Sequence, residues 1–276
     1  MIKDIVVNLS VGAQRDVAAE YAMSMARHFG AHLAAVSFCY EMVVPGSVFG
    51  SVATGLIQAQ RAESEKAAAA AITGFEETAR LAGVSFETRL FHAPLVDAVE
   101  MFGRIARRYD FAVVPQEEPD TPPGRDMIIE AALFQSGRPV VIVPYIQKDG
   151  LKLDRVTVCW DGSRNAARAV ADAMPILQKA KSVEVVVVIG AHGKSNELPG
   201  ADIAHHLARH GLKVELAELV ADDIDVPNTI LSHAADVGTD FIVMGGYGHS
   251  RWREFVLGGA TRAMLSSMTV PVLMSH

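Results

Sequence analysis

The sequence repeats itself, and this repeat constrains the fold more than any other feature. Three short apolar segments of the first half recur in the same order in the second: residues 4–10 match 155–161, residues 109–115 match 239–245, and residues 138–144 match 270–275. Recurrence in the same order indicates a duplication. The chain has 276 residues, about twice the usual domain size. We therefore predict two domains, residues 1–148 and 152–276, separated by a polar, glycine-containing segment.

Each half alternates between short β-type apolar runs and stripes with a helical period, which is typical of βαβ units in a parallel sheet covered on both faces. In the second half Ser163 is the expected N-cap of a helix that Pro175 should kink or end. Further strands are expected at residues 183–189, 214–220, 241–244 and 270–273, and helices at 201–210 and 228–237. The fold class is thus α/β, with two tandem doubly wound, Rossmann-like domains, each with a five-stranded, mostly parallel sheet.

Composition and charge exclude several classes of function. The net charge is −7, and the short cluster of Arg104, Arg107 and Arg108 has the spacing of a solvated helix face, so no nucleic-acid partner is expected. Apolar runs have the length of strands and the first residues do not resemble a signal peptide, so we expect no membrane segment and a cytoplasmic location. The two cysteines, Cys39 and Cys159, form neither a disulfide framework nor a zinc pattern.

A glycine-rich loop follows the strand expected at residues 241–244. Gly245, Gly248 and Gly258 are separated by two and nine residues, and a helix is expected to follow them. A strand, a glycine-rich turn and a helix N-terminus form the arrangement in which backbone N–H groups receive a phosphate. In parallel α/β sheets ligands bind outside the carboxyl ends of the strands, and this loop leaves such an end. The alternative is an ordinary turn before a tightly packed helix.

The spacing of these glycines resembles the ATP-binding pattern G-x2-G-x9-G-[S/T] of the universal stress protein family. Residues 156–162 with Asp161 also look like that family's first strand and turn, and the resemblance covers essentially the whole chain as two such domains. It implies an adenine nucleotide alpha hydrolase-like fold and ATP as the ligand, with or without Mg²⁺. In one departure, Gly259 stands where the pattern has serine or threonine. Its N–H is retained but the hydroxyl is lost, which bears on affinity rather than on the existence of the site.

The resemblance also implies a role for each candidate residue. Asp161 corresponds to a polar contact near the ribose or a metal, and Ile189 or Gly190 to the backbone contact on the adenine side. Thr261 corresponds to a hydroxyl donor to phosphate. The backbone contacts to the phosphates are implied at four glycines: Gly245, Gly248, Gly258 and Gly259. No residue is predicted to be catalytic and none to be a resident metal ligand.

The matching turn of the first half has lost these features. Pro115, Pro119, Pro122 and Pro123 offer no N–H donors, and four carboxylates, Glu117, Glu118, Asp120 and Asp126, would repel a phosphate. Ser10 occupies the position that corresponds to Asp161. We therefore predict one ATP per chain, in the second half.

Several alternatives stay open. Histidines 205, 206 and 210 share a predicted helix without a carboxylate at a metal-binding spacing, and His249, Ser250, Arg251 and Arg253 suit either phosphate contact or an exposed loop. The apolar segment 42–50 is a loop folded onto its own domain, a lid or a subunit contact. Besides an ATP-binding stress or signalling module with an unknown protein partner, the sequence allows a slow ATPase or autophosphorylating protein, with Thr261 or Ser250 as acceptor, or a nucleotide-free interaction module.

One prediction concerns assembly. The strands expected at residues 140–143 and 270–273 are short edge candidates that would otherwise expose unpaired backbone groups. We expect them to pair antiparallel, so that the two halves form an intrachain pseudo-dimer, as in dimers of single-domain family members. A homodimer of the whole chain is a further alternative.

Overall fold

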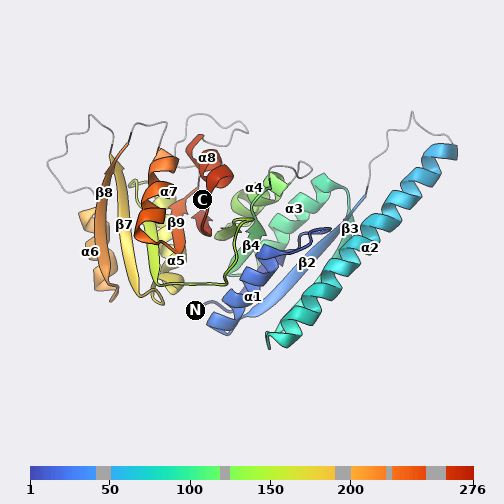
Figure 1. Ribbon diagram of the computed structural model, residues 1–276, viewed down its shortest axis with the longest axis horizontal. Helices are drawn as coiled ribbons and strands as arrows, with labels where there is room; N and C mark the ends of the chain where they lie inside the picture. Colours follow the sequence, from blue (N-terminus) through green and yellow to red (C-terminus); the bar gives the residue numbers. More distant parts are fainter. Residues whose placement is uncertain (42–50, 119–124, 190–199, 222–225, 247–258) are drawn as a thin grey trace. The chain divides into compact units, whose positions relative to one another are not determined.

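The computed structural model describes residues 1–41, 51–118, 125–189, 200–221, 226–246 and 259–276 (Figure 1). The apolar segment 42–50 of the sequence prediction lies outside these residues. The chain divides into two compact units. Unit 1 comprises Met1–Pro115 and Pro122–Ser136, and unit 2 comprises Gln116–Thr121 and Gly137–His276. The sequence division into residues 1–148 and 152–276 describes the repeats rather than these units, and it stays a prediction.

Unit 1 contains a parallel sheet whose strand order is β3-β2-β1-β4. Its strands are β1 (Asp4–Asn8), β2 (His32–Tyr40), β3 (Phe86–Ala93) and β4 (Phe111–Pro115), and its helices are α1 (Val17–Phe29), α2 (Ser51–Leu81), α3 (Leu95–Ala106) and α4 (Arg125–Gln135). The central strands β1 and β4 are almost wholly buried, whereas every residue of the edge strand β3 except its last two is half-buried. The core of unit 1 therefore lies on both faces of β1 and β4, as the continuous apolar runs require.

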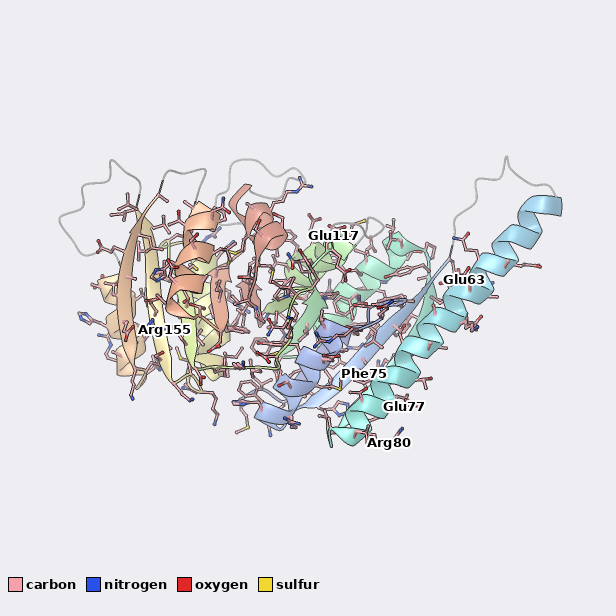
Figure 2. All side chains as sticks on the ribbon, in the orientation of Figure 1. Glu63, Phe75, Glu77, Arg80, Glu117 and Arg155 are labelled. Atoms are coloured by element: carbon pink, nitrogen blue, oxygen red, sulfur yellow. The ribbon has the colours of Figure 1, made fainter. Side chains whose placement is uncertain are left out.

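The long helix α2 covers the edge of this sheet through its second half. Phe75 packs edge to face on Phe86 of β3, with ring centroids 5.8 Å apart, while Glu77 and Arg80 are exposed (Figure 2). In the first half of α2 most of the described side chains are exposed, including Glu63. Residues 58–81 have a helix-prone composition, and the structure places them in α2, which begins at Ser51.

Unit 2 contains a sheet whose strand order is β5-β10-β9-β6-β7-β8. Its strands are β5 (Val140–Val143), β6 (Arg155–Cys159), β7 (Ser182–Ile189), β8 (Val214–Val220), β9 (Phe241–Gly245) and β10 (Val272–Ser275), and its helices are α5 (Arg164–Leu177), α6 (Ala201–Arg209), α7 (Val226–Val237) and α8 (Gly259–Ser267). Strands β6 to β10 pair in parallel, as predicted. The fold is α/β with a mostly parallel sheet.

Strand β5 pairs antiparallel with β10, which confirms the predicted strand pairing. The partners are Val140 with Met274, Val141 with Leu273, and Ile142 with Val272. Both strands are completely buried, so each covers backbone groups that the other would leave unpaired. Although β5 belongs to the first half of the sequence, it lies in unit 2.

The two units repeat the same backbone contact at the amino end of their first strand. In unit 1 the carboxylate of Asp110 accepts hydrogen bonds from the N–H groups of Lys3 and Asp4, at 2.7 and 3.1 Å. In unit 2 the carboxylate of Asp240 accepts them from Asp154 and Arg155, at 2.9 and 3.0 Å. Both aspartates precede the Phe of a matched strand, so this recurrence supports the predicted duplication.

Pro175 affects its helix less than expected. Helix α5 continues through Pro175 and ends at Leu177. Because proline has no N–H, one hydrogen bond is missing from the helix. The helix has only two residues after Pro175, so this loss affects only its last turn.

Candidate functional site

The predicted site residues come from three adjacent strands of unit 2. Asp161 follows β6 by two residues, Ile189 is the last residue of β7, and Gly245 is the last residue of β9. The order β9-β6-β7 is parallel throughout, so the three carboxyl ends meet at one edge of the sheet. The other predicted contacts at Gly190, Gly248 and Gly258 lie outside the described residues.

Asp161 is exposed and held by a local turn. Its Oδ1 accepts a hydrogen bond from the N–H of Ser163 at 2.9 Å. The hydroxyl of Ser163 in turn accepts from the N–H of Ala166 at 3.1 Å and caps α5, as predicted. One carboxylate oxygen of Asp161 thus sets the turn between β6 and α5, and the side chain stays accessible to solvent at the carboxyl end of the sheet.

The backbone of Ile189 is already engaged in the sheet. Its carbonyl accepts a hydrogen bond from the N–H of Ala221 at 3.1 Å. Because Ile189 pairs with Val220 in a parallel ladder, a carbonyl that accepts from Ala221 implies that the N–H of Ile189 is used by β8 as well. Backbone donors to a ligand would therefore have to come from the residues that follow.

Helix α8 begins with two of the predicted residues. Gly259 is its first residue and Thr261 its third, so both lie in the turn where helix N–H groups have no intrahelical partner. The side chain of Thr261 is buried, with 4% of the residue exposed. Its predicted role as a hydroxyl donor to phosphate remains a prediction.

Gly245 lies against the first turn of α5. A Cβ built on Gly245 would lie 2.6 Å from the backbone N of Ala166, 2.7 Å from the carbonyl carbon of Asn165, and 3.0 Å from the Cβ of Asn165. These distances are well below ordinary contact, and two of the three atoms belong to the backbone of a packed helix. The close approach of β9 to α5 therefore requires glycine at this position, whatever contact its backbone makes with a ligand.

A polar cluster beside Gly245 was not predicted from the sequence. The side-chain amide of Asn165 donates to the carbonyl oxygen of Gly246 at 2.5 Å, and its Nδ2 lies 3.0 Å from Nδ1 of His276. The same Nδ1 lies 3.2 Å from the Gly246 oxygen. Asn165 follows the N-cap Ser163 by two residues, but nothing in that spacing indicates a partner 81 residues away. Only the β9 to α5 approach brings them together.

The first half differs at the positions that correspond to Ser163 and Gly246. Asp16 is the N-cap of α1, and its carboxylate accepts from the N–H of Ser10 at 2.7 Å and from that of Ala19 at 3.0 Å. Gln116, which corresponds to Gly246, is buried and its amide donates to the carbonyl of Leu265 at 2.8 Å. A carboxylate thus occupies the N-terminus of α1, where unit 2 has the neutral Ser163.

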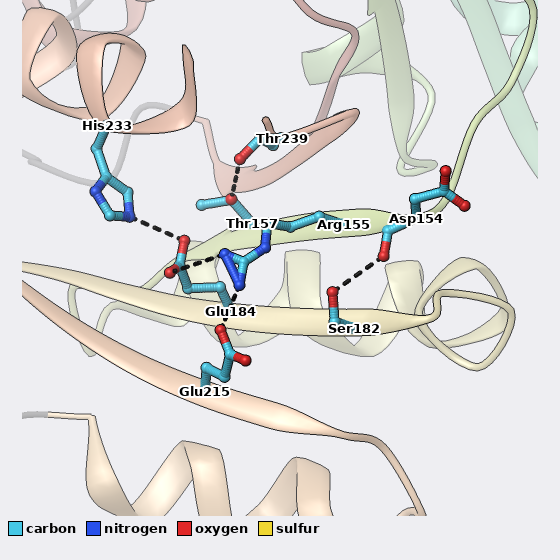
Figure 3. A network of polar contacts seen from close by, with 8 residues as sticks. All are labelled: Asp154, Arg155, Thr157, Ser182, Glu184, Glu215, His233 and Thr239. Carbon is cyan, nitrogen blue, oxygen red and sulfur yellow. Dashed lines mark hydrogen bonds and ion pairs between the residues drawn. The ribbon is translucent and has the colours of Figure 1, made fainter. Parts of the chain in front are cut away.

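A second polar network lies toward the amino ends of the strands of unit 2, away from the predicted site residues (Figure 3). The carboxylate of Glu184 lies 2.9 Å from Nε2 of His233 and 3.7 Å from Nη1 of Arg155. Arg155 also pairs with Glu215 on β8. Glu184 is buried at 5% exposure, whereas the side chain of Glu215 is 61% exposed, so the buried carboxylate is the member that depends on its partners.

The remaining candidates give no metal site. Within the described residues, no group of three or more His, Cys, Asp or Glu side chains is placed to hold a metal ion, although His206 and His210 are in ring contact at 4.8 Å. Burial raises the pKa of the Cys159 thiol to about 12, even though the residue as a whole keeps part of its surface exposed. No described helix is both long and apolar enough to cross a membrane.

This fold is a Rossmann-like α/β fold, and in the sequence the glycine pattern begins at the end of its strand β9. Residues 152–276 match the sequence model of the Universal stress protein family. Universal stress protein Slr1230 from Synechocystis is 29% identical over 146 residues, which cover 49% of this chain and 46% of that protein. The match thus spans about half the length of this relative. Residues 152–276 belong to the universal stress protein family.

Solved structures extend the likeness of fold to the whole chain. A universal stress protein from Archaeoglobus fulgidus DSM 4304 has a TM-score of 0.70 at 15% identity, over 99% of this chain and 95% of that one. A functionally unknown protein from Pseudomonas aeruginosa PAO1 has a TM-score of 0.60 at 16% identity, over 99% of this chain and 92% of that one. At this identity the likeness establishes the fold.

Proposed function

We propose that this protein is an ATP-binding universal stress protein in which unit 2 holds one adenine nucleotide and acts as a nucleotide-dependent module in stress response or signalling. The observation that carries the proposal is the glycine pattern of Gly245, Gly248 and Gly258, in a family domain whose strand and helix flank it as a phosphate loop requires. The phosphates would bind the backbone N–H groups of this loop and of the first turn of α8.

The described geometry fits a nucleotide at this edge of the sheet. Asp161 presents an exposed carboxylate beyond β6, between the ends of β7 and β9. This position suits a ribose hydroxyl, or Mg²⁺ bound together with the phosphates. Because a single carboxylate is a weak site by itself, we expect Mg²⁺ to enter with ATP rather than to reside in the protein.

The first half should not hold a second nucleotide. Its corresponding turn has Pro115 and the buried Gln116 in place of Gly245 and Gly246. The carboxylate of Asp16 already accepts the N–H of Ala19 in the first turn of α1 and that of Ser10 after β1. Loss of N–H donors and addition of like charge both weaken phosphate binding.

The test is a titration of the full chain with ATP and Mg²⁺ by calorimetry and native mass spectrometry. We expect one ATP per chain, and we expect Gly248→Val to abolish binding because its side chain would fill the phosphate space. Gly124→Val, in the corresponding turn of the first half, is the matched control and should leave affinity unchanged. Two equivalent sites, or unchanged affinity in a folded Gly248→Val variant, would refute the assignment. Continuous phosphate release from bound ATP would identify an ATPase instead.

A further inference from the structure

The start of the glycine-rich loop is fixed from three sides by described residues. The N–H of Gly246 donates to the carbonyl of Ser275 at 2.8 Å, which continues the β9–β10 pairing by one residue. The carbonyl of Gly246 accepts from the amide of Asn165 at 2.5 Å. The residue before it, Gly245, fits against the α5 backbone with no room for a side chain. Both polar groups of the Gly246 backbone are therefore used, one toward β10 and one toward α5.

His276 completes this arrangement through Asn165. The amide of Asn165 has two N–H donors: one reaches the oxygen of Gly246, and the other points to Nδ1 of His276 at 3.0 Å. In the tautomer with its proton on Nδ1, the imidazole donates instead to the oxygen of Gly246, 3.2 Å away. In the tautomer with its proton on Nε2, Nδ1 accepts the bond from Asn165. The imidazole then holds the amide in the orientation that keeps its other N–H on Gly246. His276 thus acts on the start of the loop through Asn165 in one tautomer and directly, through the Gly246 oxygen, in the other.

The corresponding positions of the first half carry no such side chains. Counting from the matched N-caps Asp16 and Ser163, the residue that corresponds to Asn165 is Ala18. The N–H of Gln116 donates to the carbonyl of Val143, as that of Gly246 does to Ser275, so the residue that corresponds to His276 is Pro144. The polar contact to the start of the loop is therefore present only in the half with the glycine pattern, although both halves keep the backbone bond.

We infer that Asn165, held by His276, is a positioning residue of the nucleotide site: it fixes the direction in which the chain leaves β9, and so the placement of the N–H groups that receive the phosphates. This inference rests on the proposed function. A residue that positions the phosphate loop should affect the affinity for ligands that carry phosphates, such as ATP. It should leave the affinity for the nucleoside adenosine unchanged, because the contacts to the nucleoside are not altered.

The test compares ATP with adenosine in the full chain. Asn165→Leu keeps the approximate shape of the side chain and removes both donors without adding charge, and Asn165→Ala introduces the residue of the first half. We expect both variants to bind ATP about two- to tenfold more weakly, the usual range for one hydrogen bond, and to bind adenosine as the wild type does. His276→Ala should change the ratio of the two affinities in the same direction by a smaller factor.

Ser163→Ala is the matched control in the same turn of α5. It removes the helix cap and lowers stability, but it leaves the amide of Asn165 in place, so the ratio of ATP to adenosine affinity should not change. If Asn165→Leu leaves the ratio of ATP to adenosine affinity unchanged, including by an equal loss for both ligands, the inference is overturned. The proposed function still stands in that case, provided that the wild type binds ATP. A wild-type chain that binds no ATP would overturn both.

Discussion

Replacing Gly245 with alanine tests the contact on which the site is built. The new Cβ would lie 2.6 Å from the backbone N of Ala166, so one of the two elements must retreat by about 0.8 Å to restore ordinary contact at about 3.4 Å. Neither can do so easily, because Val243 on β9 is fully buried and Ala169 and Ala173 on α5 are fully buried as well. Overpacking of this kind costs about 1–3 kcal/mol, and we expect the upper end of that range because backbone cannot rotate aside.

Tryptophan fluorescence during urea unfolding measures this cost in unit 2. The only two tryptophans of the chain, Trp160 and Trp252, both belong to the sequence range of unit 2, so their signal separates it from unit 1. Gly238→Ala is the matched control: its φ of 70° disfavours alanine but a Cβ there meets nothing within 4 Å. It should cost about 1 kcal/mol. A Gly245→Ala midpoint at or above that of Gly238→Ala would refute the close-packing argument.

Two further predictions concern buried groups of unit 2. Glu184→Gln should lower the free energy of unfolding by about 1–3 kcal/mol, because Arg155 loses its buried counter-charge. Glu215→Gln, at the exposed end of the same network, should lower it by less than about 1 kcal/mol. Equal effects of the two variants in urea unfolding would contradict the assigned burial. Since burial raises the pKa of Cys159 to about 12, the folded protein holds this proton more tightly than the unfolded chain, so stability should fall as pH rises above about 9. In a Cys39→Ala background the thiol should react with a disulfide reagent at pH 8 only after unfolding, and rapid labelling of the native protein would exclude this environment.

Many strand positions could be predicted from the sequence, because a buried parallel strand needs a continuous apolar run and three of these runs recur in both halves. The strand expected at residues 214–220 is β8, and the antiparallel pairing of β5 with β10 follows from two short apolar edges that need partners. Helix ends were less predictable. Pro175 was expected to kink or end α5. The free energy that a proline costs a helix depends on how many helical residues follow it, and tertiary packing sets that number.

The candidate site could be predicted only where the local backbone conformation requires a particular residue type. Glycines at fixed spacing indicate a phosphate loop, and Asp161 with Ser163 indicates a turn before a helix. Asn165 and His276 are different, because their roles depend on a contact between residues far apart in the chain. No local pattern distinguishes an asparagine in the first turn of an exposed helix from one that holds the start of a loop.

The two halves share a backbone contact at the amino ends of their strands and differ in side chains at the carboxyl ends. At the amino ends both units keep an aspartate that accepts two backbone N–H groups, Asp110 in one and Asp240 in the other, since this bond holds the first strand in any copy of the fold. At the carboxyl ends the first half has replaced Ser163 by the carboxylate of Asp16 and Asn165 by Ala18. A fixed carboxylate satisfies the helix N-terminus that a bound anion would otherwise approach. These changes at the carboxyl ends are therefore the pattern expected when one repeat keeps the fold but loses the ligand.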